Sequence, residues 1–125
     1  MISTVISILR NVAPIATLVD DRIYAGRAPQ NATMPNIVIA KTSEREEYEL
    51  GGAAGIADAR FVVICRGDRL ALAYDLGQAV ISALRYCRIG DALIQRDTVD
   101  STDIVNDGRD IHFRTVGFTM FYAPP

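Results

Sequence analysis

The few side chains that can carry chemistry in this 125-residue chain do not form a catalytic arrangement. His112 is the single histidine, and it lies in an apolar stretch two residues before Arg114. Catalysis of the Ser-His-Asp type needs a nucleophile and an acid held against the imidazole, and the neighbouring sequence supplies no such motif. We therefore interpret His112 as a surface or interface residue.

Two acidic clusters raise the question of a cation site. The first cluster comprises Glu44, Glu46, Glu47 and Glu49, and the second comprises Asp100, Asp103, Asp107 and Asp110. The first alternates along a charged segment, which is typical of a solvated hairpin face, and the second lacks the ligand spacing of a calcium-binding loop. We predict that the protein uses no metal and no cofactor.

The glycine-rich segment and the cysteines give no enzymatic signature either. Residues 51–55 are Gly-Gly-Ala-Ala-Gly and lack the Lys-Ser/Thr pair of a phosphate-binding loop, and no G-x-S-x-G or G-x-G-x-x-G motif is present. Cys65 and Cys87 are predicted to be free thiols, because a chain without an export signal stays in a reducing compartment. The sequence thus predicts a protein that is not an enzyme.

Charge and hydropathy exclude two further classes of protein. The 13 basic and 15 acidic residues give a net charge of −2, whereas a protein that grips DNA through its phosphates carries a basic excess. No window is apolar over the roughly 18 residues that a membrane span needs, since Arg10, Asn11 and Pro14 interrupt the apolar N-terminal stretch. The length predicts a single domain over residues 1–125.

The N-terminal half predicts a broken helix followed by a long hairpin. Apolar residues at helical spacing from Ile2 to Ala13 predict a helix that ends or kinks at Pro14, with a short second turn through Leu18. The predicted elements after it are a strand at 22–26, a loop at 27–35, a strand at 36–42, a charged arm at 43–50, a glycine-rich tip at 51–55 and a strand at 57–66.

The C-terminal half predicts one long helix and two strands. The helix covers residues 69–88 with Asp68 as its N-cap, and Gly77 indicates a close approach between helix and sheet. Its core stripe comprises Leu70, Ala73, Leu76, Gly77, Val80, Leu84 and Cys87. The elements after it are a turn at 90–91, a strand at 92–98, a polar loop at 99–109 and a strand at 111–122.

Together these elements predict an α+β fold, with an antiparallel-rich sheet of four to five strands and two helices packed on one face. Both faces of the strands at 59–66 and 111–122 carry apolar side chains, although a sheet with one solvated face alternates cleanly. We expect a second copy of the chain to cover the free face. The alternative is that the charged hairpin or the Pro-rich loop folds over that face.

Three short segments carry a resemblance to a known family. They are Leu-Val-Asp-Asp-Arg-Ile-Tyr at 18–24, Arg-Ala-Pro-Gln at 27–30 and Met-Pro-Asn-Ile-Val at 34–38. In this order, and followed by an aromatic-rich closing strand, they resemble the tail-completion family of long-tailed bacteriophages and phage-like gene transfer agents. The resemblance covers nearly the whole chain.

The resemblance implies a tail terminator, also called a tail-to-head joining protein. Such proteins form a hexameric ring on the head-proximal end of the tail tube, end tube polymerisation and dock the head-tail connector or head-completion protein. The expected partners are therefore further copies of the chain, the major tail tube protein and the connector, and DNA passes through the lumen without specific binding. The expected location is the neck of the virion, after synthesis in the bacterial host cytoplasm.

Candidate interface residues follow from the exposed segments. We expect the arm at 43–55 to make an axial contact, and Arg22 and Arg60 to pair with carboxylates of a neighbouring subunit. The full candidate set is Arg22, Tyr24, Arg27, Pro29, Gln30, Glu44, Arg45, Glu46, Glu47, Tyr48, Arg60, Phe118, Met120 and Tyr122.

Two other functions stay open at this point. One is a different neck component, such as a head-completion or adaptor protein. The other is a small cytoplasmic enzyme whose site is shared between subunits, with His112 and the nearby aspartates in it.

Overall fold

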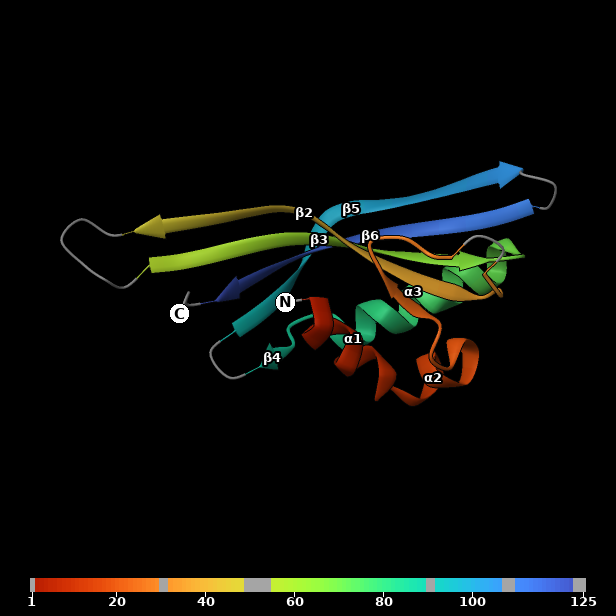
Figure 1. The fold of residues 1–125 in the computed structure, drawn as a ribbon, viewed down its shortest axis with the longest axis horizontal. Coiled ribbons are helices and arrows are strands. Elements are labelled where there is room, and N and C mark those ends of the chain that lie inside the picture. Colours follow the sequence, from red (N-terminus) through yellow and green to blue (C-terminus); the bar gives the residue numbers. More distant parts are fainter. Residues whose placement is uncertain (1, 30–31, 49–54, 90–91, 107–109, 123–125) are drawn as a thin grey trace.

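Three helices pack on one face of a six-stranded sheet in a computed structural model that describes residues 2–29, 32–48, 55–89, 92–106 and 110–122 (Figure 1). For residues 43–48, 55–57, 89, 98–99, 105–106, 110 and 122 only the backbone is described. The elements are α1 (Ile2–Arg10), α2 (Ala13–Val19), β1 (Ile23–Ala25), β2 (Asn36–Tyr48), β3 (Gly55–Gly67), α3 (Leu70–Leu84), β4 (Arg88–Ile89), β5 (Ala92–Asn106) and β6 (Asp110–Tyr122).

The strand order is β1-β2-β3-β6-β5-β4, so the sheet has six strands and not the predicted four to five. β1 pairs with β2 in parallel and all other pairs are antiparallel, which makes the sheet mixed. The β2–β3 hairpin and the β5–β6 hairpin extend from opposite ends of the molecule along its longest axis (Figure 1). The two edge strands are very short, with three residues in β1 and two in β4.

Two segments that the sequence predicts as arm or loop are strand. β2 continues from Asn36 to Tyr48, so the charged arm stays paired with β3, and β5 continues to Asn106 through the predicted polar loop. The prediction of a loop at 99–109 is therefore wrong for residues 99–106. Polar side chains do not prevent pairing, because the ladder forms through backbone groups and the side chains can stand in solvent. Of the tip predicted at 51–55, Gly55 begins β3, and residues 51–54 lie outside the described residues, as does the predicted turn at 90–91.

The predicted break near Pro14 is confirmed, although α1 already ends at Arg10 and α2 begins at Ala13, one residue before the proline. α1 and α2 meet at an angle of 94°, and Pro14 occupies the first turn of α2, where its missing N–H costs no hydrogen bond. Val5 and Leu9 of α1 and Ile15 and Val19 of α2 are fully buried. The two short helices therefore contribute one apolar wedge to the layer beneath the sheet.

α3 supplies the rest of that layer but is shorter than predicted. It ends at Leu84, and Arg85 is already extended. Asp68 does not cap the helix, because the N-cap position falls on Arg69 and no side chain caps it. Leu70, predicted in the core stripe, is 52% exposed because it lies in the first turn, ahead of the part of α3 that packs on the sheet.

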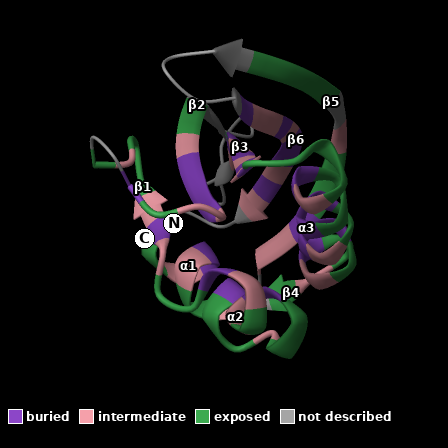
Figure 2. Ribbon diagram, turned by 90° about the vertical axis from the view of Figure 1, so that its right-hand side faces the viewer, coloured by how far each residue is buried: buried purple, intermediate pink, exposed green. Residues whose placement is uncertain are grey.

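The core lies between the helices and one face of the sheet, where the buried sides of the helices meet the strands (Figure 2). Phe61 of β3 and Phe118 of β6 are stacked there, with ring centroids 5.6 Å apart. Burial of each such side chain contributes roughly 1.5–3 kcal/mol before conformational entropy is subtracted. Cys65 is buried beside them, and both cysteines are free as predicted.

Candidate assembly interface

No described element covers the sheet face opposite the helices (Figure 1). Two rows of paired residues cross its centre, Val38–Ile64–Thr115 and Ala40–Val62–Gly117. Val62 and Ile64 of β3 are half-buried although no helix lies over them. The centre of this face, which we call the open face, is therefore apolar and lies between rows of polar residues.

Aromatic and charged side chains flank the centre of the open face. Phe113 and Phe121 lie on it near the two ends of β6, and both are half-buried. Arg66 pairs with Phe113 across the strands, and its guanidinium lies over the ring at 5.6 Å from the centroid. Arg60 is exposed in the row of Thr119. The pattern of an apolar centre with a polar rim is common in protein–protein interfaces.

Two of the predicted interface residues do not lie on the open face, so their prediction is wrong. Phe118 is fully buried and Met120 is 5% exposed, because both point into the core beneath the sheet. Alternation along a strand places neighbouring residues on opposite faces, so Phe113, Thr115 and Phe121 occupy the open face instead. Tyr122 lies in β6, and its side chain is outside the described part.

The candidates near the N-terminal helices lie at the β1 edge of the sheet. Arg22 is half-buried, and it donates from Nε to the carbonyl of Pro35 at 3.0 Å and from Nη2 to the carbonyl of Leu18 at 3.1 Å. It therefore fastens α2 to the start of β2 within one chain. Tyr24 is half-buried in β1, and Arg27 and Pro29 are exposed in the loop that follows. Gln30 lies outside the described residues.

The charged arm is a regular part of β2. Its residues pair in register with β3 from Ser43↔Arg60 to Tyr48↔Gly55, after a bulge between Lys41 and Ser43. In the described residues the arm therefore extends the sheet and does not fold back over the open face. The candidates in this segment are Glu44, Arg45, Glu46, Glu47 and Tyr48, which are placed by their backbone only.

An ion pair between a buried arginine and a partly exposed aspartate on the helix side of the sheet was not predicted from the sequence. Arg114 of β6 is 4% exposed, and its guanidinium binds Asp100 of β5 through two hydrogen bonds of 3.1 and 2.9 Å. It also donates to the Tyr74 carbonyl at 3.1 Å and to Gln78 Oε1 at 2.9 Å, both on α3. Gly77 makes room for this side chain, which confirms the predicted close approach at that glycine.

Two further contacts complete the environment of this pair. The Arg114 guanidinium lies 4.4 Å from the centroid of the Tyr74 ring, and Arg96 donates to Asp100 Oδ2 at 2.7 Å. The hydrogen bond from Arg114 holds the pKa of Asp100 below its ordinary value. The same bond raises the pKa of Arg114, and both groups therefore stay charged. The network joins α3, β6 and the irregular stretch of β5 between Arg96 and Asp100.

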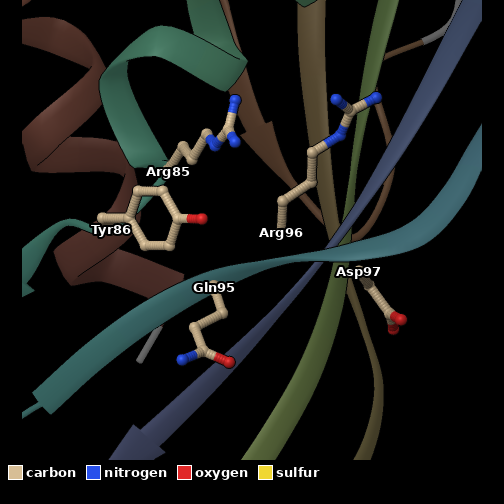
Figure 3. A pocket seen from close by; sticks show the side chains of 5 residues that line it. All are labelled: Arg85, Tyr86, Gln95, Arg96 and Asp97. Carbon is tan, nitrogen blue, oxygen red and sulfur yellow. The ribbon is translucent and has the colours of Figure 1, made fainter.

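Two hollows lie where α3 runs beside β5. The larger has a volume of about 550 Å³, and the α3–β5 hollow, as we call it, is lined by Arg85, Tyr86, Gln95, Arg96 and Asp97 (Figure 3). The smaller, of about 300 Å³, is lined by Leu70, Thr102, Asp103 and Ile104 at the other end of the helix. Both are open to solvent.

The described residues contain no cluster of three or more histidine, cysteine or acidic side chains that could hold a metal ion. His112 pairs with Ile104 and Gly67 near the end of the β5–β6 hairpin and is half-buried. Among the described helices none is long and apolar enough alone to span a membrane, although α1 and α2 together meet the length and composition criteria despite their 94° bend. Each helix buries two of its large apolar side chains in the core, Val5 and Leu9 in α1 and Ile15 and Val19 in α2.

Comparison with known families decides the family of the chain. The family model described as tail completion protein gp17 matches residues 3–121. The chain belongs to this family. A solved structure titled as the virion of a native gene transfer agent particle contains a chain with the same fold, with a TM-score of 0.71, 18% identity, and coverage of 96% of this chain and 92% of that one. No curated protein matches the sequence. Membership of this family makes the chain a structural component of a phage-type tail, and the solved structure shows that the fold is shared.

Proposed function

We propose that copies of this tail completion protein form a ring, six in number as in the terminators that the sequence resembles, at the head-proximal end of the tail tube. The ring stops the addition of tube subunits and presents a surface to the head-tail connector. The net charge of −2 supports a lumen through which DNA passes without binding.

The open face of the sheet is the observation that carries this proposal. Its centre presents Val62 and Ile64 with Phe113 and Phe121 toward the strand ends, and all three helices pack on the other side. An apolar surface that none of the described helices and strands covers is typical of an assembly interface. A component at the end of a polymer needs such contacts with other copies and with the tube, so the surface matches the role of the family.

The test is a deletion of the gene in particle-producing cells, followed by complementation and electron microscopy of the products. We expect the deletion to give tails of irregular length that carry no heads. Tails of normal length without heads would assign the protein to a head-completion or adaptor role instead. Complete, infectious particles from the deletion strain would refute a role in tail completion.

A pair of variants tests the open face directly. Ile64→Asp places a charge at its apolar centre, and Ser3→Asp places the same charge on the exposed side of α1. We expect Ile64→Asp to abolish complementation while the purified protein keeps its cooperative unfolding, and Ser3→Asp to complement normally. Equal complementation by both variants would show that the open face is not an interface.

A further inference from the structure

The α3–β5 hollow gathers positive charge beside an exposed aromatic ring. Arg85 lies over the ring of Tyr86 at 5.1 Å from its centroid, and within the described part of the chain no carboxylate lies within 4.0 Å of Arg85. Arg96 enters from β5 on the same side as Arg85, whereas Asp97 points to the other side of the strand (Figure 3). Arg88 is exposed two residues after Tyr86. The hollow therefore suits an acidic ligand.

The backbone at this place is arranged to present the tyrosine. Tyr86 has a φ of 59°, in the left-handed region that residues other than Gly and Asn seldom adopt. The tyrosine is 66% exposed. Burial therefore does not compensate for this conformation. A large aromatic side chain held in solvent by an unfavourable backbone is common at binding surfaces.

The exposed large hydrophobic side chains of the described residues all lie along the same seam between α3 and β5. They are Leu70, Tyr74, Tyr86 and Ile104. β4 pairs only with Ala92 and Leu93, so beyond Leu93 the outer edge of β5 has no partner strand among the described residues. Figure 2 shows that most of the described part of β5 is exposed. The seam thus combines a free sheet edge with apolar and cationic side chains.

The chain carries a matching acidic element at the other side of the sheet. The segment 43–48 of β2 contains three glutamates and one arginine, and Glu49 follows it. β1 pairs with β2 only at Ile37, Val38 and Ile39, so the outer edge of this segment has no partner strand among the described residues. In the strand order, β2 and β5 lie on opposite sides of the β3–β6 centre.

We propose that the α3–β5 hollow receives the acidic β2 arm of a second copy of the chain. Complementary surfaces on opposite edges of one subunit produce head-to-tail contacts, which close into a ring when the rotation between subunits allows it. Carboxylates of the arm then bind the guanidinium group of Arg85, whereas Arg96 stays bonded to Asp100 Oδ2 at 2.7 Å, and Tyr86 packs against the arm. The inference rests on the ring of the proposed function, and it places the arm in a lateral contact within that ring instead of an axial one.

A charge exchange in the full-length protein tests this contact. Arg85→Glu and the double variant Glu46→Arg/Glu47→Arg each place like charges at the contact, so each should weaken self-association on the order of tenfold or more in sedimentation equilibrium. The triple variant that combines these changes restores opposite charges and should recover association. Arg10→Glu, which reverses an exposed arginine on α1, is the matched control and should associate like the wild type.

Tyr86→Gly separates docking from folding. Glycine adopts a positive φ without strain, so the thermal unfolding of this variant should match or exceed that of the wild type while association weakens. Three results would overturn the proposal: wild-type protein that sediments as a monomer at every concentration, Arg85→Glu protein that associates normally, or a triple variant no better than its parents.

Complementation of the deletion strain keeps this inference apart from the proposed function. If the deletion impairs particles and Arg85→Glu still complements fully, the docking contact is refuted and the tail role stands. If the deletion leaves particles unchanged, the tail role is refuted. Failure of Arg85→Glu together with recovery in the triple variant supports both.

Discussion

The substitution Gly77→Ala gives the sharpest test of how α3 is held against the sheet. In an exposed helix this change stabilises a protein by about 1 kcal/mol, because alanine loses less backbone entropy. At Gly77 a Cβ atom would lie 2.5 Å from Cδ and 3.0 Å from Nη1 of Arg114. The Arg114 side chain cannot simply swing away, since four hydrogen bonds hold its guanidinium to Asp100, Tyr74 and Gln78.

The magnitude follows from these opposing effects. Overpacking of a tight site costs about 1–3 kcal/mol, and each charge-assisted hydrogen bond lost to a shifted arginine costs about 1.5–3 kcal/mol. The Asp100 side chain is 28% exposed, so water offsets part of the second cost. We therefore expect Gly77→Ala to lower the free energy of unfolding by about 1–3 kcal/mol. In a background with Arg114→Ala the clash is absent, and the same change should be stabilising by about 1 kcal/mol.

Urea unfolding followed by circular dichroism measures all four corners of this double-mutant cycle. We expect the effect of Gly77→Ala on the free energy of unfolding to change sign between the two backgrounds. The matched control is Ala79→Gly on the same helix, which should destabilise both backgrounds equally. If Gly77→Ala stabilises the wild-type protein, or destabilises both backgrounds by the same amount, the Arg114 contact does not explain the glycine.

Three further predictions concern the ion pair, the buried thiol and the two faces of β6. The pKa of Asp100 is lower in the folded chain than its ordinary 3.8, so the charged carboxylate stabilises the fold fully above that value and loses this effect as the pH falls below it. Asp100→Asn should therefore be less stable than the wild type at pH 7, and the difference in the free energy of unfolding should shrink toward pH 2 in urea titrations. Burial raises the pKa of Cys65 to about 12, so in a Cys87→Ser protein a thiol reagent at pH 8 should modify Cys65 only at the rate of unfolding, and rapid modification of the folded protein would contradict its burial. Phe118→Ala should cost about 3–5 kcal/mol of stability and Phe113→Ala about 1 kcal/mol or less, with the larger effect on assembly in Phe113→Ala; equal unfolding midpoints would contradict the assignment of the two faces.

The parts of the fold that local physics determines could be predicted from the sequence. The break at Pro14, the amphipathic α3 and the hairpin of β2 and β3 follow from backbone chemistry and hydrophobic periodicity, and all three are present. β1 (Ile23–Ala25) lies within the strand predicted at 22–26, whereas β4 was not predicted, because two residues are too few to show a period. The extension of β5 through residues 99–106 was missed because its polar residues resemble those of a loop.

The candidate interface could be predicted only in outline. Apolar residues on both faces of β6 indicate that a second surface needs cover, but alternation alone does not tell which face meets the helices. Arg114 decides the question, since its charge on the helix side is tolerated only beside Asp100 and above a glycine on α3. A charged residue in register with core positions, combined with a glycine in the middle of a helix, is the signal in the sequence that could have revealed this contact.

The opposite directions of the two hairpins have a mechanical consequence. β3 and β6 pair over eleven residues at the centre of the sheet and continue into the β2–β3 and β5–β6 hairpins at opposite ends of the molecule. Tension applied between the two hairpins would load the backbone hydrogen bonds between β3 and β6 in shear, so that these bonds resist together and do not open one after another. A subunit built in this way can transmit a pull from one hairpin to the other with little deformation of its own.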